Sequence, residues 1–271
     1  MSMSRETLFT DDSMLRRVIG QKVVGLSGPR ALLMQAAHPV AFAGFFAHTG
    51  ALDEPYERLR RTARVLNLIA FGPKDRAQQA TRRVRAMHRR VRGELAEPAG
   101  RFPAGTPYAA DDPALLLWIL ATVADSAAVV YQRYVGSLSA DEREGLWADY
   151  RVVGREFGLR KRDMPATWDD FQAYMADMVA GEDLHVSDSA RELAVQIVMR
   201  PPVALHVRPL VELTNQITIG LLPTRLRRAY GFRWDPVRAV AARGGAEYAK
   251  RLVVPFLPER MRLVRGARRA A

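Results

Sequence analysis

The sequence predicts an all-α protein, a single globular domain of about ten helices. Nearly every segment of the 271-residue chain has the apolar spacing of an amphipathic helix. Runs of alternating apolar and polar residues between hairpin turns are missing. Capping residues and Gly or Pro breaks divide the chain into pieces of helical length. We expect one domain over residues 1–271, with a candidate seam at 97–112 and a frayed tail from about residue 266.

The first helices are separated by Gly-Pro breaks. A helix starts after Asp11-Asp12-Ser13 with "MLRRVIGQKVVGL", and Gly28-Pro29 ends it. The apolar run "QAAHPVAFAGFFAHTG" follows. Next comes the amphipathic segment "EPYERLRRTARVLNLIAFG", which Gly72-Pro73 stops. After this break the helix "DRAQQATRRVRAMHRRVRGEL" is expected.

The second half begins after a loop rich in Pro and Gly. Asp112 followed by Pro113 is a typical helix start, and that helix should run to about Tyr134. Ser139 with Glu142, and Thr167 with Asp170, have the spacing of capping boxes. Further helices are expected to end at Pro201-Pro202 and at Pro223, and Asp235-Pro236 opens the last ones.

The composition excludes several classes of metal and catalytic site. With no cysteine, disulfides, thiolate metal sites, iron–sulfur clusters and cysteine nucleophiles are excluded, and five histidines remain as the soft ligands. The longest apolar run, Ala114 to Ala124, ends at Asp125 and is too short to span a bilayer, so we expect a buried core helix and no transmembrane segment. Asp125 itself needs a partner, either an arginine or helix N-terminus, or a pocket histidine. The N-terminus lacks the pattern of an export signal, so a cytoplasmic location is expected.

The chain is strongly basic, with a formal charge of +12, and six arginines lie between Arg82 and Arg92. Such a cluster is compatible with nucleic acid, an anionic membrane or an acidic ligand. It is equally compatible with an ordinary solvated surface. No helix-turn-helix spacing accompanies it, so no nucleic-acid partner is expected.

One histidine lies inside an apolar stripe. On a helical wheel, Val84, Met87, Val91 and Leu95 share a face, and His88 lies within it. Such an imidazole is either hydrogen-bonded in the core or a metal or haem ligand. On the preceding helix, Arg58 and Thr62 project one turn apart at the margin of the core. They too have an ordinary interpretation, as a surface arginine and a back-bonded threonine.

Together these segments resemble the rubber oxygenase (latex clearing protein) and MpaB-type oxygenase family. The likeness is carried, in the expected order, by "LLMQAAHPVAFAGFFAHTG", "YERLRRTARVLNLIAFG", "VRAMHRRVRG", "YAADDPALLLWILATVADS" and "GLLPTRLRRAYGFRWDP". The resemblance implies an all-helical fold around a haem b pocket. In the characterised rubber oxygenases it also implies O2-dependent cleavage of carbon–carbon double bonds.

The resemblance also implies roles for individual residues. His88 matches the proximal ligand of the haem iron, and Arg58, Arg61 and Thr62 match the segment on the distal side. Arg61 stands where the rubber enzymes have a lysine that can coordinate the iron, and a guanidinium cannot take that role because it stays protonated. Leu120 stands where many relatives are expected to have a histidine.

The apolar run "QAAHPVAFAGFFAHTG" would then line the haem pocket that the resemblance implies. His38 or His48 would face the open side of the haem, a propionate or the substrate, and Pro39 predicts a break or kink at His38. The alternative is that one of the two caps a helix end and the other packs in the core. Further apolar residues would accommodate haem or a hydrophobic substrate: Phe42, Phe45, Phe46 and Trp118.

Three functions remain open from the sequence. The first is a haem b-dependent oxygenase that acts on an unknown apolar small molecule, with O2 or peroxide bound opposite the histidine and an unidentified electron donor. The second is a haem-binding carrier or sensor without turnover. The third is a basic helical protein that binds nucleic acid or an anionic surface. A homodimer is compatible with each.

Overall fold

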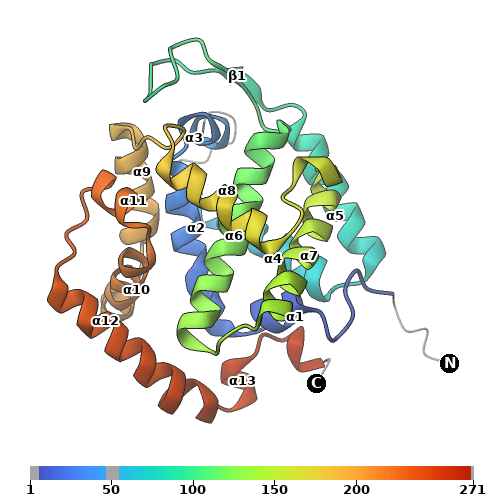
Figure 1. Cartoon of the computed structure of the whole chain (residues 1–271), viewed down its shortest axis with the longest axis vertical. Helices are drawn as coiled ribbons and strands as arrows, with labels where there is room; N and C mark the ends of the chain where they lie inside the picture. Colours follow the sequence, from blue (N-terminus) through green and yellow to red (C-terminus); the bar gives the residue numbers. More distant parts are fainter. Residues whose placement is uncertain (1–5, 47–54, 270–271) are drawn as a thin grey trace.

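The computed structural model describes residues 6–46 and 55–269, and within these ranges all side chains except those of 45, 46, 55–60, 193, 194 and 269. The described residues form α-helices and one small two-stranded sheet, which confirms the all-α prediction (Figure 1). The first helices are α1 (Met14–Ile19), α2 (Ser27–Ala36), α3 (Pro39–Phe46), α4 (Pro55–Phe71) and α5 (Lys74–His88). Later helices are α6 (Pro113–Tyr134), α7 (Ala140–Phe157), α8 (Trp168–Ala180), α9 (Asp188–Met199), α10 (Arg208–Leu221), α11 (Thr224–Ala229), α12 (Pro236–Tyr248) and α13 (Glu259–Arg262).

Helix α6 is the central element of the core. Asp112 caps it, because its Oδ1 accepts from the backbone N–H groups of Ala114 (2.8 Å) and Leu115 (3.2 Å). Helices α2 and α7 pack directly against α6. Within the described residues α6 is the one helix long and apolar enough to cross a membrane, but 67% of its most apolar window is buried inside the protein. The expected buried core helix is therefore confirmed.

The core around α6 contains one buried ion pair. Arg30 Nη1 of α2 lies 2.7 Å from Asp125 Oδ2 and also donates to Ser126 Oγ (2.7 Å). Arg30 Nε donates to the carbonyl of Leu221 (2.8 Å) at the end of α10. The expectation of an arginine partner for Asp125 is confirmed, and this network joins α2, α6 and α10.

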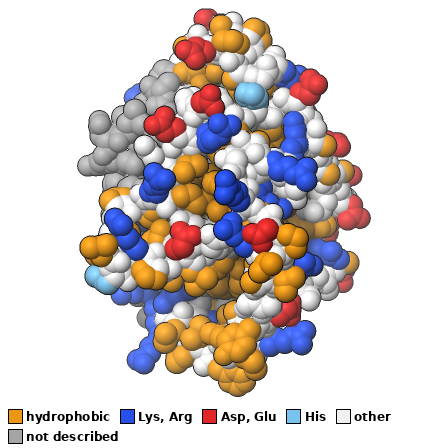
Figure 2. Space-filling view, turned by 90° about the vertical axis from the view of Figure 1, so that its left-hand side faces the viewer, with side chains coloured by type: hydrophobic (Ala, Val, Ile, Leu, Met, Phe, Trp, Pro, Cys, Tyr) orange, Lys and Arg blue, Asp and Glu red, His pale blue; other side chains and the backbone are white. Residues whose placement is uncertain are grey.

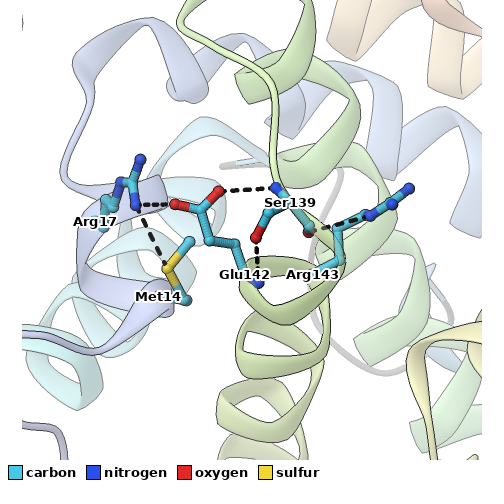
Figure 3. Close-up of polar contacts among 5 residues, drawn as sticks. All are labelled: Met14, Arg17, Ser139, Glu142 and Arg143. Atoms are coloured by element: carbon cyan, nitrogen blue, oxygen red, sulfur yellow. Dashed lines mark hydrogen bonds and ion pairs between the residues drawn. The ribbon is translucent and has the colours of Figure 1, made fainter.

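Both predicted capping boxes form. Ser139 Oγ accepts from Glu142 N (3.1 Å), and Glu142 Oε2 accepts from Ser139 N (2.8 Å) at the start of α7. Figure 3 shows that the other carboxylate oxygen of Glu142 meets Arg17, whose guanidinium also approaches Met14 Sδ (3.9 Å). The cap of α7 is thus also a contact with α1. Thr167 and Asp170 make the second box at the start of α8.

The loop between α5 and α6 differs from the expectation. Helix α5 ends at His88, and β1 (Arg92–Glu94) pairs antiparallel with β2 (Pro107–Ala109) across the segment considered as a seam. Strands of three residues are too short to show an alternating pattern. Val91 and Leu95, placed by the sequence on the helical stripe of His88, lie instead in a small second cluster with Val40 and Tyr108.

The C-terminal residues return to the N-terminal part of the fold. Val264 N donates to Gly20 O (2.9 Å), and Gln21 forms an isolated bridge with Leu263. A Cβ atom on Gly266 would lie 2.5 Å from Cγ of Phe71 at the end of α4. Where fraying was expected from about residue 266, the described residues 267–269 form a short 3-10 turn against the body of the protein.

Candidate functional site

The candidate site is built on the hairpin of α4 and α5. Only Gly72 and Pro73 separate the two helices, which pack against each other. Because the connection is so short, the chain must reverse direction. At a rise of about 1.5 Å per residue, His88 lies about 21 Å from this turn, the backbone of Arg58 about 20 Å and Thr62 about 14 Å. The hairpin thus brings His88 to the level of the first half of α4.

His88 is the last residue of α5. Its side chain is half-buried, although the expected apolar stripe is broken, since the neighbouring Met87 is 47% exposed. The carbonyl of His88 accepts from Val91 N (3.0 Å), which turns the chain towards β1. The imidazole therefore stands where a basic helix ends, partly sheltered and partly accessible.

The middle turn of α4, about one helical turn nearer the Gly72-Pro73 connection than His88, is open to solvent. All four residues from Arg61 to Arg64 are exposed, whereas Ile69 and Ala70 further along are fully buried. The guanidinium of Arg61 and the hydroxyl of Thr62 are therefore accessible to a ligand. The side chains of Arg58, Phe45 and Phe46, and the whole of His48, lie outside the described part of the chain, so the structure does not place these four predictions.

His38 lies at the break between α2 and α3. Its side chain is buried, its Nδ1 accepts from Ala41 N (3.4 Å), and its ring packs on Phe102 at a centroid distance of 5.5 Å. Burial lowers the pKa of His38, opposed by the charge of Asp183. This position corresponds to the helix-capping alternative. The contact with Phe102 brings His38 towards the loop between β1 and β2.

The sequence did not predict the polar residues that surround His38. Arg101 and Asp183 form an ion pair beside it, and His185 N donates to Ala37 O (2.8 Å). Gly100 has a φ of +61°, and a Cβ there would lie 2.6 Å from Cβ of His185. A glycine in a loop was the one available signal, because the partners lie far apart in sequence.

Of the four apolar residues predicted to line the pocket, Trp118 and Phe42 have described side chains, and both belong to the main core cluster or pack against it. Trp118 on α6 is fully buried, and its indole Nε1 has no hydrogen-bond partner among the described residues. Phe42 on α3 is half-buried and packs against the same cluster as Trp118. Of the two, Phe42 is the one with accessible surface.

The haem that the sequence leads us to expect would need few donors from the protein. Within residues 6–46 and 55–269 there is no group of three or more His, Asp or Glu that could hold an ion. A haem iron receives four nitrogens from its porphyrin and needs one axial ligand from the protein, for which a single imidazole suffices. His88 can supply it, and the exposed arginines of α4 and α5 can pair with propionates.

Fold and site together define an all-helical domain with a histidine-bearing hairpin as its candidate centre. A family model described as "ER-bound oxygenase mpaB/B'/Rubber oxygenase, catalytic domain" matches residues 16–262. The chain therefore belongs to this family of oxygenase catalytic domains, as its motifs indicated. No curated protein and no solved structure matches it.

Proposed function

We propose that this protein is a haem b-dependent oxygenase that acts on an apolar small molecule. The observation that carries the proposal is the hairpin of α4 and α5, which brings the half-buried imidazole of His88 to the level of the first half of α4, about one turn further from the Gly72-Pro73 turn than the exposed Arg61 and Thr62. Membership of an oxygenase family supports the same reaction class. When bound, the haem would supply the site where O2 or peroxide is activated.

The residues of the chain have separate tasks in this proposal. His88 would hold the iron through one ring nitrogen. The hydroxyl of Thr62 would donate a hydrogen bond to the oxidant. Arg61 would supply a positive charge to the oxidant or to a propionate, so its role would be to orient and not to coordinate. Phe42 offers a half-buried apolar surface to the substrate.

The first test is the absorption spectrum of the purified protein. We expect a Soret band that His88→Ala abolishes or strongly weakens. His206→Ala is the matched control, because His206 is exposed on a short 3-10 turn before α10 and should leave the band unchanged. A full Soret band in the His88→Ala protein would show that the ligand is another residue.

The second test separates an enzyme from a carrier. Steady-state O2 consumption is measured with ascorbate as the reductant and a series of terpenoid hydrocarbons as probes. Thr62→Val should lower the rate while leaving the Soret band in place, since the hydroxyl acts on the bound oxidant and does not hold the iron. A haem-loaded protein that consumes no O2 with any probe would indicate a carrier or sensor.

A further inference from the structure

Helix α12, near the C-terminus, presents apolar side chains to solvent. Helix α12 continues without a break through a π-turn (Ala249–Val253) and a 3-10 turn (Val254–Phe256). Along this segment five large apolar residues are each at least 58% exposed. They are Val237, Val240, Tyr248, Leu252 and Phe256.

These residues share one side of the segment. Their separations are multiples of three to four residues, which is the spacing of a helix face. The opposite side faces the protein: Ala246 and Val254 are buried, and Lys250 Nζ donates to Gln132 O (3.1 Å) at the end of α6. A surface helix of a globular protein usually turns its apolar stripe inwards. Here Ala246 and Val254 face the core, whereas most of the large apolar residues face outwards.

Positive charge surrounds these five apolar residues, which we call the apolar ridge. Residues 233–265 contain eight Lys or Arg and three Asp or Glu. Two of the acids are already paired, Asp235 with Arg238 (3.4 Å) and Glu247 with Arg251 (3.1 Å). Figure 2 shows this side of the molecule, where apolar side chains gather at the lower end and Lys and Arg border them. Figure 1 places the end of α12 at that lower end.

The positive charge around the apolar ridge distinguishes between the partners that could cover it. A symmetric dimer would set the same patch of two copies face to face, so their excess positive charges would repel each other. A partner of opposite charge avoids this repulsion. The ridge is a single helix along the edge of the protein, as Figure 1 shows, so it suits a broad, flat and deformable surface.

We infer that the segment from Pro236 to Phe256 docks the protein on an anionic lipid surface. The apolar ridge enters the boundary between headgroups and acyl chains, and the flanking arginines meet lipid phosphates. Binding of this kind is peripheral and reversible. It uses none of the residues of the α4–α5 hairpin, so it holds whether or not the protein carries haem.

The test is co-sedimentation of the full-length protein with lipid vesicles. We expect binding to equimolar phosphatidylcholine and phosphatidylglycerol, little binding to phosphatidylcholine alone, and release by salt because the headgroup attraction is screened. Leu252→Ser and Phe256→Ser should each weaken binding about tenfold, since each removes a large inserted side chain. Arg243→Gln should weaken it about fivefold, the value of one basic residue near an anionic membrane.

Two control variants distinguish vesicle binding through the apolar ridge from non-specific adsorption. Met87→Ser removes an exposed apolar residue on α5, and Arg155→Gln removes an exposed arginine on α7, so both should bind as the unmodified protein does. Circular dichroism checks that every variant is folded. The inference is wrong if the unmodified protein stays in the supernatant, or if the Leu252 and Phe256 variants still sediment fully. A dimer that dissociates in those variants would assign the ridge to a second copy.

Discussion

His38 carries a pH dependence that follows from its surroundings. Burial is the main reason why its pKa lies below the ordinary value of 6.5, Arg101 adds to the effect, and Asp183 and Asp112 oppose it. Because the pKa is lower in the folded protein, the unfolded chain binds the proton first as the pH falls. The stabilisation is therefore complete above the unfolded value and is lost as the pH drops below it.

Thermal unfolding across this range tests the effect. We expect the Tm to fall from about pH 7 to pH 5, where histidine titrates, and to fall less steeply in His38→Gln, which cannot take up the proton. The glutamine amide oxygen can still accept from Ala41 N, so the start of α3 keeps its cap. Identical slopes in the two proteins would assign the acid sensitivity to other groups.

Asp125 is paired with the guanidinium of Arg30, and both side chains are almost entirely buried. The side chains of Arg30 and Asp125 are 5% and 13% exposed. Asp125→Ala should lower the free energy of unfolding by about 3–5 kcal/mol, since it leaves a guanidinium buried without its counter-ion. Urea unfolding measures the change.

A surface pair provides the matched control for Asp125. Glu247→Gln breaks the exposed ion pair with Arg251 and should change stability by no more than about 0.5 kcal/mol. The double variant Arg30→Met, Asp125→Leu should recover most of the loss, because neither charge then remains buried. A loss in the double variant as large as in Asp125→Ala would mean that packing, and not charge, is the cause.

Single residues were predictable where one local rule decides the outcome. A carboxylate in an apolar helix must have a partner, so an arginine could be expected for Asp125 from the sequence alone. The identity of Arg30 could not, because it lies 95 positions away and depends on the packing of α2 against α6. The same limit applies to His38, whose neighbours Phe102 and Asp183 come from two distant loops.

At the scale of elements, the capping box of α7 is a testable stabilising unit. Hydrogen bonds from the backbone of Ser139 and from Arg17 lower the pKa of Glu142, so the carboxylate stays charged at the helix start. Ser139→Ala removes the acceptor for Glu142 N and should cost about 1 kcal/mol. Ser137→Ala in the preceding loop is the control, since Ser137 is exposed and outside the box. Equal denaturation midpoints for the two variants would contradict the role of the cap.

Helix boundaries were predictable where a capping residue or a proline marks them. Asp112, Ser139, Thr167 and Asp235 all cap helices as their sequences indicate, because a cap is decided by contacts over three residues. The end of α5 was placed too late, since the apolar stripe continues to Leu95 although the chain has already left the helix. Val91 and Leu95 are drawn into the cluster of Tyr108, and that tertiary contact overrides the helical period. For the candidate site, the spacing of Arg61, Thr62 and His88 was visible in sequence, but their exposure was not.

At the scale of the whole molecule, the segment around Gly266 packs against the end of α4. Gly266→Ala should lower the free energy of unfolding by about 1–3 kcal/mol, because the added methyl group would overlap the ring of Phe71. Gly245→Ala in α12 is the matched control. A Cβ there meets nothing within 4 Å, so alanine should raise helix stability by about 0.5–1 kcal/mol. Differential scanning calorimetry compares the two, and a stabilised Gly266→Ala protein would show that the C-terminal segment moves away at no cost.

Helix α6 has the length and apolarity of a bilayer-crossing segment, and yet it contains Asp125. During synthesis this helix emerges long after Arg30, so the arginine is already available when the carboxylate appears. A lone Asp at the middle of a lipid-embedded helix costs about 2.5–3.5 kcal/mol on insertion scales, whereas inside the protein the same group finds its cation. Asp125 therefore disfavours the insertion of α6 into a bilayer and favours its burial beside Arg30.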